Sequence, residues 1–195
     1  MSLTTQTVTG DQFAHWIDPV ANLRISVFRE FPYLYAGDVD YERRYLQRYQ
    51  DSSGSVLILA LDGDQLVGAS TGLPLVDADA AFQAPFKAKG MDLKTIFYFG
   101  ESVLLSKFRG GGIGHRFFDE RERVAKAQGF TITTFCAVVR PADHPMRPEH
   151  YRPHDQFWNK RGYQSRPDLE CEYSWLDLDQ DRETPKTMRF WLREW

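Results

Sequence analysis

Two kinds of hydrophobic pattern follow one another along this chain. Residues 56–61 and 66–73 are short, largely apolar runs of the kind that buried strands have. Asp62 and Gly63 lie between them, and this dipeptide favours the tight turn of a β-hairpin. An antiparallel hairpin is therefore predicted at 56–73.

The clearest helical pattern lies in residues 112–128, where apolar side chains recur on one side and charged side chains occupy the other. Gly129 follows directly and is a typical helix end. Segments 95–105 and 131–139, rich in β-branched and aromatic residues, flank this helix as predicted strands. A strand, a turn, a helix and a strand in this order predict a βαβ unit with one parallel pair of strands.

The N-terminal part combines a predicted strand with two predicted helices. The strand is expected at 5–9, and helical spacing begins after Asp11, a residue type that often caps helices. Proline is expected to break this helix at Pro19 and to end it at Pro32. Asp38 then starts the second helix.

The remaining segments complete a mixed architecture. Residues 77–94 are predicted to be a loop with some helix, and the chain ends in two predicted strands at 172–178 and 186–195. An early hairpin, a later βαβ unit and terminal strands indicate an α+β or mixed α/β fold. The length of 195 residues fits a single domain, 1–195.

Charge and composition narrow the class of function. The chain has 24 Lys and Arg against 27 Asp and Glu, a formal net charge of −3, which argues against a protein that neutralises nucleic-acid phosphates. Residues 1–10 are polar, unlike a signal peptide, and no apolar run is long enough to cross a bilayer. Two cysteines form no Cys-x-x-Cys pair. A cytoplasmic protein without a nucleic-acid or membrane partner is expected.

A glycine-rich turn precedes the helix at 112–128. Its four glycines are Gly110, Gly111, Gly112 and Gly114. Glycine allows backbone N–H groups to converge, and a helix N-terminus adds partial positive charge, so the turn is suited to a phosphate group. The P-loop and dinucleotide patterns both fail here, because His115 stands where a Lys or the last Gly is needed. A structural turn that binds nothing is the alternative.

The pattern that fits this turn is R-x-x-G-x-G, formed by Arg109, Gly112 and Gly114. A second segment, F-W-N-K-R-G-Y at 157–163, follows after one predicted helix and one predicted strand. On these two motifs the chain resembles the GNAT superfamily of acetyl-CoA-dependent N-acetyltransferases, over roughly residues 55–163. The resemblance implies a central mixed, mostly antiparallel sheet that is splayed between its fourth and fifth strands and flanked by helices.

The same resemblance implies where acetyl-CoA binds, in a core at about 95–163. Backbone N–H groups of the glycine turn would hold the pyrophosphate, and the preceding strand would pair with the pantetheine arm beside an aromatic side chain. The implied cofactor-binding residues are Ser102, Val103, Leu104, Leu105, Arg109, Gly110, Gly111, Gly112, Ile113, Gly114, His115 and Trp158.

Acetyl transfer to an amine requires that the amine lose a proton. Glu101, just before the cofactor strand, is the candidate general base, and a strand-end carboxylate facing solvent is the alternative. Many family members have a tyrosine acid where Trp158 stands, and indole is not a usable acid. Two possibilities for the departing thiolate remain open: it takes a proton from the hydroxyl of Tyr98, Tyr151 or Tyr163, or it leaves unaided.

The resemblance places the acceptor between the early helices and a proline-rich insert at 140–156. Tyr33, Tyr35 and His144 are the substrate candidates. Six basic minus three acidic residues in 140–166 leave +3, which would favour an acidic acceptor, although such charge is usually solvated. The three histidines of the insert match no zinc spacing, so no metal is expected.

The expected function is transfer of an acetyl group from acetyl-CoA to a primary amine of a small molecule by direct attack. A protein or peptide amine as the acceptor, and a non-catalytic acyl-CoA-binding domain, are the alternatives. The apolar C-terminal residues Phe190, Trp191, Leu192 and Trp195 would suit a homodimer interface or a core equally.

Overall fold

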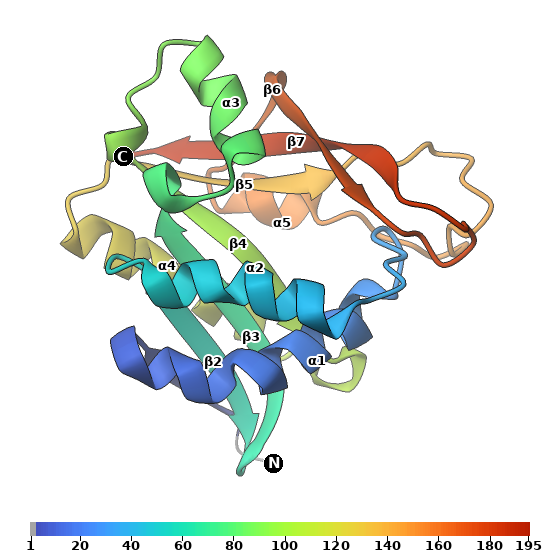
Figure 1. Ribbon diagram of the computed structural model, residues 1–195, viewed down its shortest axis with the longest axis horizontal. Coiled ribbons are helices and arrows are strands. Elements are labelled where there is room, and N and C mark those ends of the chain that lie inside the picture. Colours follow the sequence, from blue (N-terminus) through green and yellow to red (C-terminus); the bar gives the residue numbers. More distant parts are fainter. Residues whose placement is uncertain (1–2) are drawn as a thin grey trace.

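The computed structural model describes residues 3–195, which form one seven-stranded sheet in the order β1-β2-β3-β4-β5-β7-β6 (Figure 1). Every neighbouring pair is antiparallel except β4 and β5. The strands are β1 (Leu3–Val8), β2 (Val56–Asp62), β3 (Gln65–Pro74), β4 (Ile96–Leu104), β5 (Ile132–Val138), β6 (Gln164–Trp175) and β7 (Thr184–Glu194).

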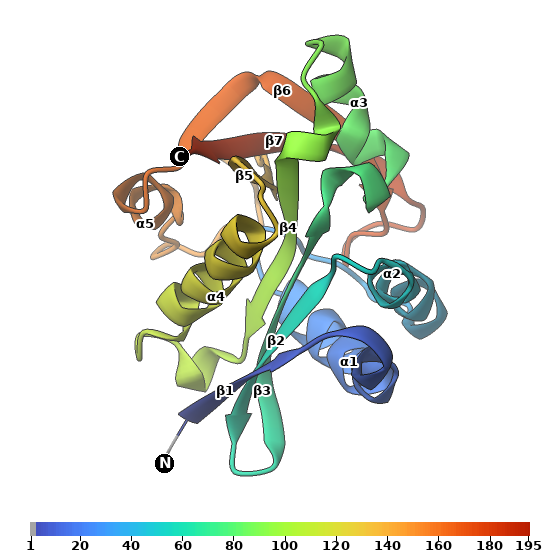
Figure 2. The ribbon, with the colours of Figure 1, turned by 90° about the vertical axis from the view of Figure 1, so that its left-hand side faces the viewer.

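Helices cover both faces of this sheet (Figure 2). Helices α1 and α2 lie on one face, and α4 and α5 lie on the other. The α-helices are α1 (Ile17–Phe28), α2 (Val39–Asp51), α3 (Ala80–Ala88), α4 (Ile113–Ala127) and α5 (Asp155–Lys160). Short 3-10 helices are η1 (Gly10–Trp16), η2 (Leu75–Asp77), η3 (Leu93–Thr95) and η4 (Ser106–Phe108).

Each face of the sheet has its own hydrophobic core, and β2 contributes to both. Leu57 and Leu59 are buried under α1 and α2, whereas Ile58 packs with Phe97 and Phe117 under α4. Successive side chains of a strand point to opposite faces, so a strand covered on both sides must be apolar at every position. This is the reason for the continuous apolar run that predicted β2.

The predicted hairpin, βαβ unit and mixed sheet are confirmed. The β2–β3 hairpin turns between Asp62 and Gln65, and β4, α4 and β5 form the βαβ unit. The apolar C-terminal residues lie in β7, between β5 and β6, where Phe190 is fully buried.

Two sequence-based boundaries were wrong. The break expected near Asp18-Pro19 lies two residues earlier, where the 3-10 helix η1 ends at Trp16 and α1 begins at Ile17. Pro19 is the third residue of α1, where a backbone N–H has no intrahelical partner and its loss costs nothing. The strand expected from 172 begins at Gln164, because residues 164–166 and 170–175 of β6 both pair with β7. Pro167 lies within a register shift between Arg166 and Glu170, where no ladder bond is needed.

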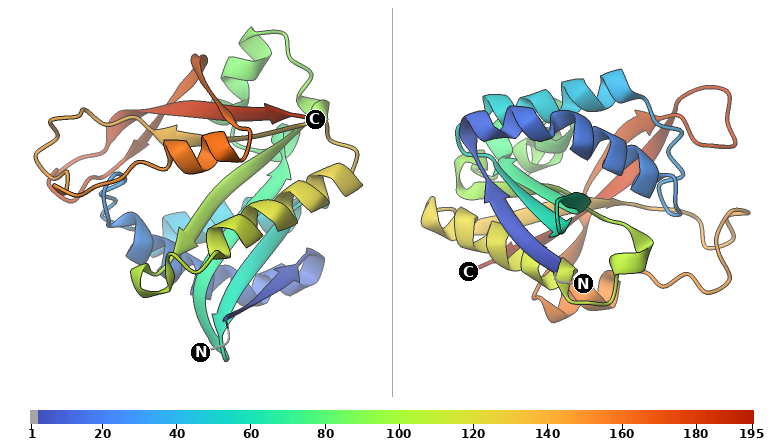
Figure 3. Two further views of the ribbon diagram at one scale, coloured as in Figure 1. Left: turned by 180° about the vertical axis from the view of Figure 1, so that it is seen from behind. Right: turned by 90° about the horizontal axis from the view of Figure 1, so that it is seen from below.

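The feature that creates the site is the separation of β4 from β5. The two strands pair only at Ile96–Ile132, Phe97–Thr133 and Tyr98–Thr134, and then diverge. Strands β5, β7 and β6 cross the upper part of the molecule at a steep angle to β2, β3 and β4 (Figures 1 and 3). Beyond Tyr98, β4 therefore keeps its β3 neighbour but has an open edge on its other side.

Candidate functional site

The open edge of β4 presents backbone hydrogen-bonding groups to a cleft. The Leu105 N–H donates to the carbonyl of Val67 in β3 at 3.0 Å. Because successive residues of a strand point their backbone groups to opposite edges, Leu104 and Ser102 direct theirs to the unpaired edge. The side chain of Ser102 also borders the cleft, whereas that of Val103 is fully buried on the other face.

The glycine turn lies at the end of this strand and opens α4. Gly110 and Gly112 have φ values of 83° and 85°, a region that disfavours residues with a side chain. Gly112 is the N-cap of α4 and no side chain caps the helix. Among residues 3–195, no protein acceptor takes the backbone N–H groups of residues 110–115. A Cβ added at Gly110 or Gly112 would meet no atom within 4 Å, so the turn faces open space.

Together these features fit an anionic group with an extended chain. Uncapped N–H groups and the α4 dipole favour an anion at the turn. The open edge of β4 offers the pairing positions of a missing strand. The residues present therefore fit the pyrophosphate and pantetheine arm of acetyl-CoA.

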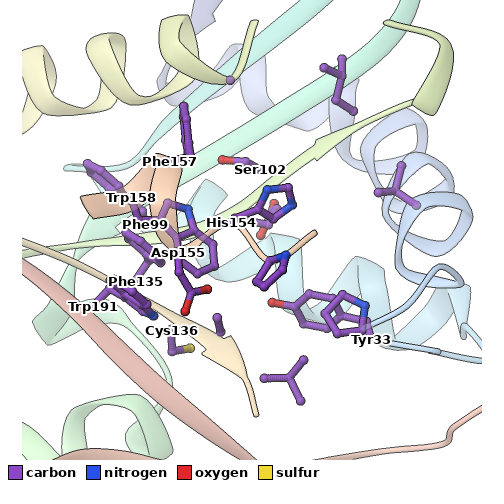
Figure 4. A pocket seen from close by; sticks show the side chains of 18 of the residues that line it. Tyr33, Phe99, Ser102, Phe135, Cys136, His154, Asp155, Phe157, Trp158 and Trp191 are labelled. Carbon is purple, nitrogen blue, oxygen red and sulfur yellow. The ribbon is translucent and has the colours of Figure 1, made fainter. Parts of the chain in front are cut away.

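A cleft of about 720 Å³ runs along this edge, between α4 and α5. The side chains of Phe99, Phe135, Phe157, Trp158 and Trp191 gather on one side of it, and Tyr33 lies across from them (Figure 4). The Trp158 ring lies 5.0 Å from the rings of both Phe135 and Trp191, measured between centroids. Its position is therefore set by packing from β5 and β7.

Ion pairs and ring contacts hold the glycine turn in place. Arg109 donates from Nε to the carbonyl of Leu104 at 2.9 Å and pairs with Glu30 at 2.7 Å. The His115 ring lies 4.8 Å from that of Phe157 in α5. His154 also borders the cleft, and burial, followed by the positive charge of Arg109, lowers its pKa. This histidine is neutral at pH 7.

Arg121 borders the cleft, and the sequence analysis did not single it out. It is 1% exposed and comes from α4, yet no carboxylate among residues 3–195 lies within 4 Å of its guanidinium. Its guanidinium donates to the carbonyls of Thr71 and Glu101, at 3.2 and 3.1 Å, and to Ser102 Oγ at 2.8 Å. Burial lowers its pKa to about 10, which still leaves it charged at pH 7. The sequence offered one signal for Arg121: it stands four residues after Phe117 and so lies on the apolar face of the predicted helix, where an arginine is unusual.

A β-bulge in β4 directs Glu101 away from this cation. Between the pairs Ser70–Ser102 and Gly72–Phe99, β4 has two residues, Gly100 and Glu101, opposite one in β3. The Glu101 side chain consequently lies on the α1 and α2 face, where it is buried. The alternative interpretation of Glu101, a strand-end carboxylate facing solvent, is wrong for this reason.

Gly100 is expected to tolerate no side chain. An added Cβ would overlap the Tyr49 hydroxyl and lie 2.5 Å from Thr71 Oγ1. We expect Gly100→Ala to lower the free energy of unfolding by about 1–3 kcal/mol, the usual cost of overpacking. Urea denaturation measures this, with Gly111→Ala as the matched control because its nearest atom would be 3.9 Å away. Equal stability of the two variants would contradict the close packing of the bulge.

Glu101 belongs to a buried cluster of three charges. Arg24 of α1 pairs through Nε with Glu42 of α2 and through Nη1 with Glu101. Tyr45 donates to the same Glu101 oxygen, Oε2, at 3.2 Å. Burial disfavours the charged guanidinium, but the two carboxylates outweigh it and hold the pKa of Arg24 well above its usual value. Glu101 Oε1 and Glu42 Oε1 have no hydrogen-bond partner among residues 3–195.

The cleft brings together most of the predicted site residues, but not all of them. Tyr33 borders it, whereas Tyr35 and His144 do not. His144 packs behind Phe31, with the rings 5.8 Å apart. Eight of the predicted cofactor-binding residues border the cleft: Ser102, Leu104, Arg109, Gly110, Gly112, Gly114, His115 and Trp158. Those outside it are Val103, Leu105, Gly111 and Ile113.

Two further observations concern the described residues 3–195. They contain no group of three or more His, Cys, Asp or Glu side chains placed to hold a metal ion. None of their helices combines the length and the apolar character needed to span a membrane.

Solved structures with the same fold cover nearly the whole chain. A ribosomal-protein-alanine N-acetyltransferase from Brucella melitensis has a TM-score of 0.64 at 12% identity, over 98% of this chain and 99% of that one. A Drosophila melanogaster polyamine N-acetyltransferase that forms N-acetylagmatine has a TM-score of 0.63 at 10% identity, over 100% of both chains. A Salmonella typhimurium structure with its cofactor acetyl-CoA has a TM-score of 0.61 at 9% identity, over 100% of this chain and 94% of that one.

The chain therefore has the fold of the GNAT acetyltransferases, as the two motifs implied. No family model and no curated protein sequence matches it. At identities of 9–12%, the likeness establishes the fold.

Proposed function

We propose that this protein is an acetyl-CoA-dependent N-acetyltransferase that acetylates a primary amine of a small molecule by direct attack. One observation carries the proposal: the unpaired edge of β4 runs directly into a glycine turn whose N–H groups at 110–115 have no acceptor within the described part of the chain, 3–195. This arrangement suits a ligand with a peptide-like arm and a pyrophosphate. Neighbours of the same fold are described as acetyltransferases, and one contains acetyl-CoA.

The chain's backbone would hold the cofactor in this proposal. Residues 110–115 would bind the pyrophosphate, and Ser102 and Leu104 would pair with the pantetheine arm along the open edge. Acetyl-CoA supplies the activated acyl group when bound. The Ser102 N–H, next to the bulge, would stabilise negative charge on the acyl oxygen, and Arg121 keeps that strand segment in position through its bonds to Glu101 and Ser102.

Glu101 would take the proton of the attacking amine. Its Oε2 is occupied by Arg24 and Tyr45, but its Oε1 is unpartnered and can accept a hydrogen bond from an amine. Glu101 borders the cleft at the point where β4 and β5 separate. Positioning of the amine against the acyl group would supply much of the acceleration.

No single side chain is assigned as the acid for the departing thiolate. Tyr163 is buried and donates to Glu122 at 3.1 Å, and Tyr98 lies 3.3 Å from Cys136 Sγ. Tyr151 borders the cleft. The positive charge of Arg121 in the cleft wall would favour unaided departure of an anion.

Release of free CoA thiol on a panel of amines tests the activity. We expect Glu101→Gln to lower kcat by about 100-fold while the affinity for acetyl-CoA stays within a factor of two. Calorimetry of acetyl-CoA binding and thiol release by colorimetric assay provide the two readouts. Full turnover of Glu101→Gln between pH 6 and 9 would rule out its role as base.

The alternatives give different results in the same assays. Acetyl-CoA binding without thiol release on any amine or peptide would indicate a non-catalytic acyl-CoA-binding domain. Thiol release only with peptides would indicate a protein acceptor. The fold does not separate these cases, because its neighbours include both a ribosomal-protein-alanine and a polyamine N-acetyltransferase.

A further inference from the structure

A second, smaller cavity of about 80 Å³ lies beside the cleft, and the glycine turn does not line it. It lies on the sheet face that α1 and α2 cover, and we call it the aromatic chamber. Gly100 and Glu101 of β4 and Cys136 of β5 border both the chamber and the cleft. The two spaces therefore meet where the strands separate, next to the position proposed for the acyl group.

Aromatic rings make up most of the chamber wall. Six of the nine tyrosines border it, together with Phe28, Phe82 and Trp175. The tyrosines are Tyr33, Tyr35, Tyr41, Tyr45, Tyr98 and Tyr173. Burial raises the pKa of each of them, so all are neutral at pH 7. Several of their hydroxyls already form hydrogen bonds within the protein, as between Tyr41 and Tyr173 at 2.6 Å. A ligand in the chamber would therefore contact mainly the faces and edges of the rings.

Among residues 3–195, the charged residues that line the chamber are Glu42, Glu101 and Arg24, which sum to −1 when all three are ionised. Arg121 lies outside this lining, on the other side of β4, and its charge also acts on Glu101. Glu42 is 1% and Glu101 is 6% exposed, and each has a carboxylate oxygen without a partner. A buried excess negative charge is costly unless a cation or hydrogen-bond donors compensate it. An aromatic wall with an unpaired carboxylate is the environment that favours an organic ammonium group.

The chamber offers less to an anion than to a cation. Arg24 is the one cation that lines it among residues 3–195; this arginine forms ion pairs with both carboxylates, and its Nη1 has no further hydrogen bond. Arg140 and Arg147, two of the six basic residues that contribute to the positive charge of 140–166, border only the larger cleft. Arg140 is bound to Asp177 at 2.8 Å, and Arg147 stacks on Tyr151 at 5.0 Å. The expectation of an acidic acceptor, based on the charge of the insert, thus finds no support at the chamber.

We propose that the aromatic chamber binds the acceptor, and that the acceptor is a compact cationic amine without a carboxylate next to its amino group. This rests on the acetyltransferase activity proposed above. The ammonium group is held by Glu42 and Glu101 and by the surrounding rings. Glu101 first takes one proton from it, and the free amine then attacks the acyl carbon; the amide forms as the C–S bond breaks, and the second proton of the nitrogen leaves with the thiolate as free CoA thiol. A volume of about 80 Å³ admits a few non-hydrogen atoms, so a short alkyl amine fits and an amino acid is repelled.

A matched pair of ligands tests this on the unmodified protein. n-Butylamine and norvaline differ by one carboxylate next to the amine. We expect kcat/KM for n-butylamine to exceed that for norvaline at least 100-fold, because the second ligand places a negative charge beside a net negative cluster. Titration of the CoA-loaded protein with ¹³C-labelled tyrosines should show shifts of chamber tyrosines with n-butylamine.

Two variants test whether the carboxylate charge sets the preference. Glu42→Gln removes one negative charge, so the n-butylamine affinity should fall about tenfold and the preference over norvaline should shrink at least tenfold. The preference is a ratio within one variant, so partial unfolding does not alter it. Asp40→Asn removes a carboxylate from the exposed side of the same helix and should change neither value.

The outcomes separate this inference from the proposed activity. Equal or better acetylation of norvaline overturns the inference and leaves the activity intact. Chamber tyrosines that do not respond to an amine that is turned over also overturn it. Binding of n-butylamine at these tyrosines, without thiol release on any amine, supports the chamber as an amine site and rejects the acetyltransferase.

Discussion

Acetyl-CoA affinity is expected to fall at least 100-fold when Gly112 is replaced by aspartate. Gly112 has φ of 85°, which a residue with a side chain adopts only with strain. It also precedes the uncapped N–H groups of α4, so an aspartate places its negative charge where the pyrophosphate would bind. The aspartate removes a charge-assisted contact to the pyrophosphate and also repels it, and both effects lower the affinity for acetyl-CoA. Isothermal titration calorimetry with acetyl-CoA measures the change.

Gly129 provides a matched control at the other end of α4. It has φ of 84°, and an added Cβ would also meet nothing within 4 Å. Gly129→Asp therefore introduces the same side chain with similar backbone strain, but away from the cleft. We expect both variants to lose about 1–2 kcal/mol of stability and only Gly112→Asp to lose affinity. If Gly112→Asp binds acetyl-CoA as well as Gly129→Asp does, the turn is not the pyrophosphate site.

Replacement of Arg24 with methionine is expected to lower the free energy of unfolding by about 3–5 kcal/mol. The side chains of Arg24, Glu42 and Glu101 are all buried, and the arginine is the cation that both carboxylates share. Its removal leaves both buried carboxylates without the cation that pairs with them. Chemical denaturation at neutral pH measures the loss.

An exposed arginine and a compensating variant make this prediction specific. Arg43 pairs with Asp18 at 2.7 Å on the surface, where such pairs contribute about 0–1 kcal/mol, so Arg43→Met should lose little. Adding Glu42→Met and Glu101→Gln to Arg24→Met should restore at least half of the lost stability, because none of the three charges of the cluster then remains. A loss below about 1 kcal/mol for Arg24→Met would show that water reaches the carboxylates, and the charge argument for the chamber would fail with it.

Local sequence patterns were sufficient to predict those elements whose signal lies within a few consecutive residues. The hairpin at Asp62-Gly63 and the helix with Phe117 and Phe118 on one face were predicted correctly, since turn chemistry and periodicity lie within a few residues. The glycine turn was located for the same reason: φ near 85° at Gly112 needs glycine whatever surrounds it.

Other features depended on partners far along the chain. The early start of β6 follows from pairing with β7, which overrides the weak strand signal near Pro167. Glu101 was singled out from its place before the cofactor strand, but its burial depends on the bulge at Gly100 and on Arg24 and Glu42 from two helices. Neither helix pattern showed that these residues would meet.

The sequence by itself determined the mixed α/β class, the order of its main elements and the turn that can bind an anion, because these follow from local backbone preferences and hydrophobic periodicity. The tertiary structure decided which charges face one another. It placed Arg121 against the bulge of β4, and it closed six tyrosines and a net negative cluster around a small chamber. Electrostatic interactions depend on distance and burial, and the folded chain sets both.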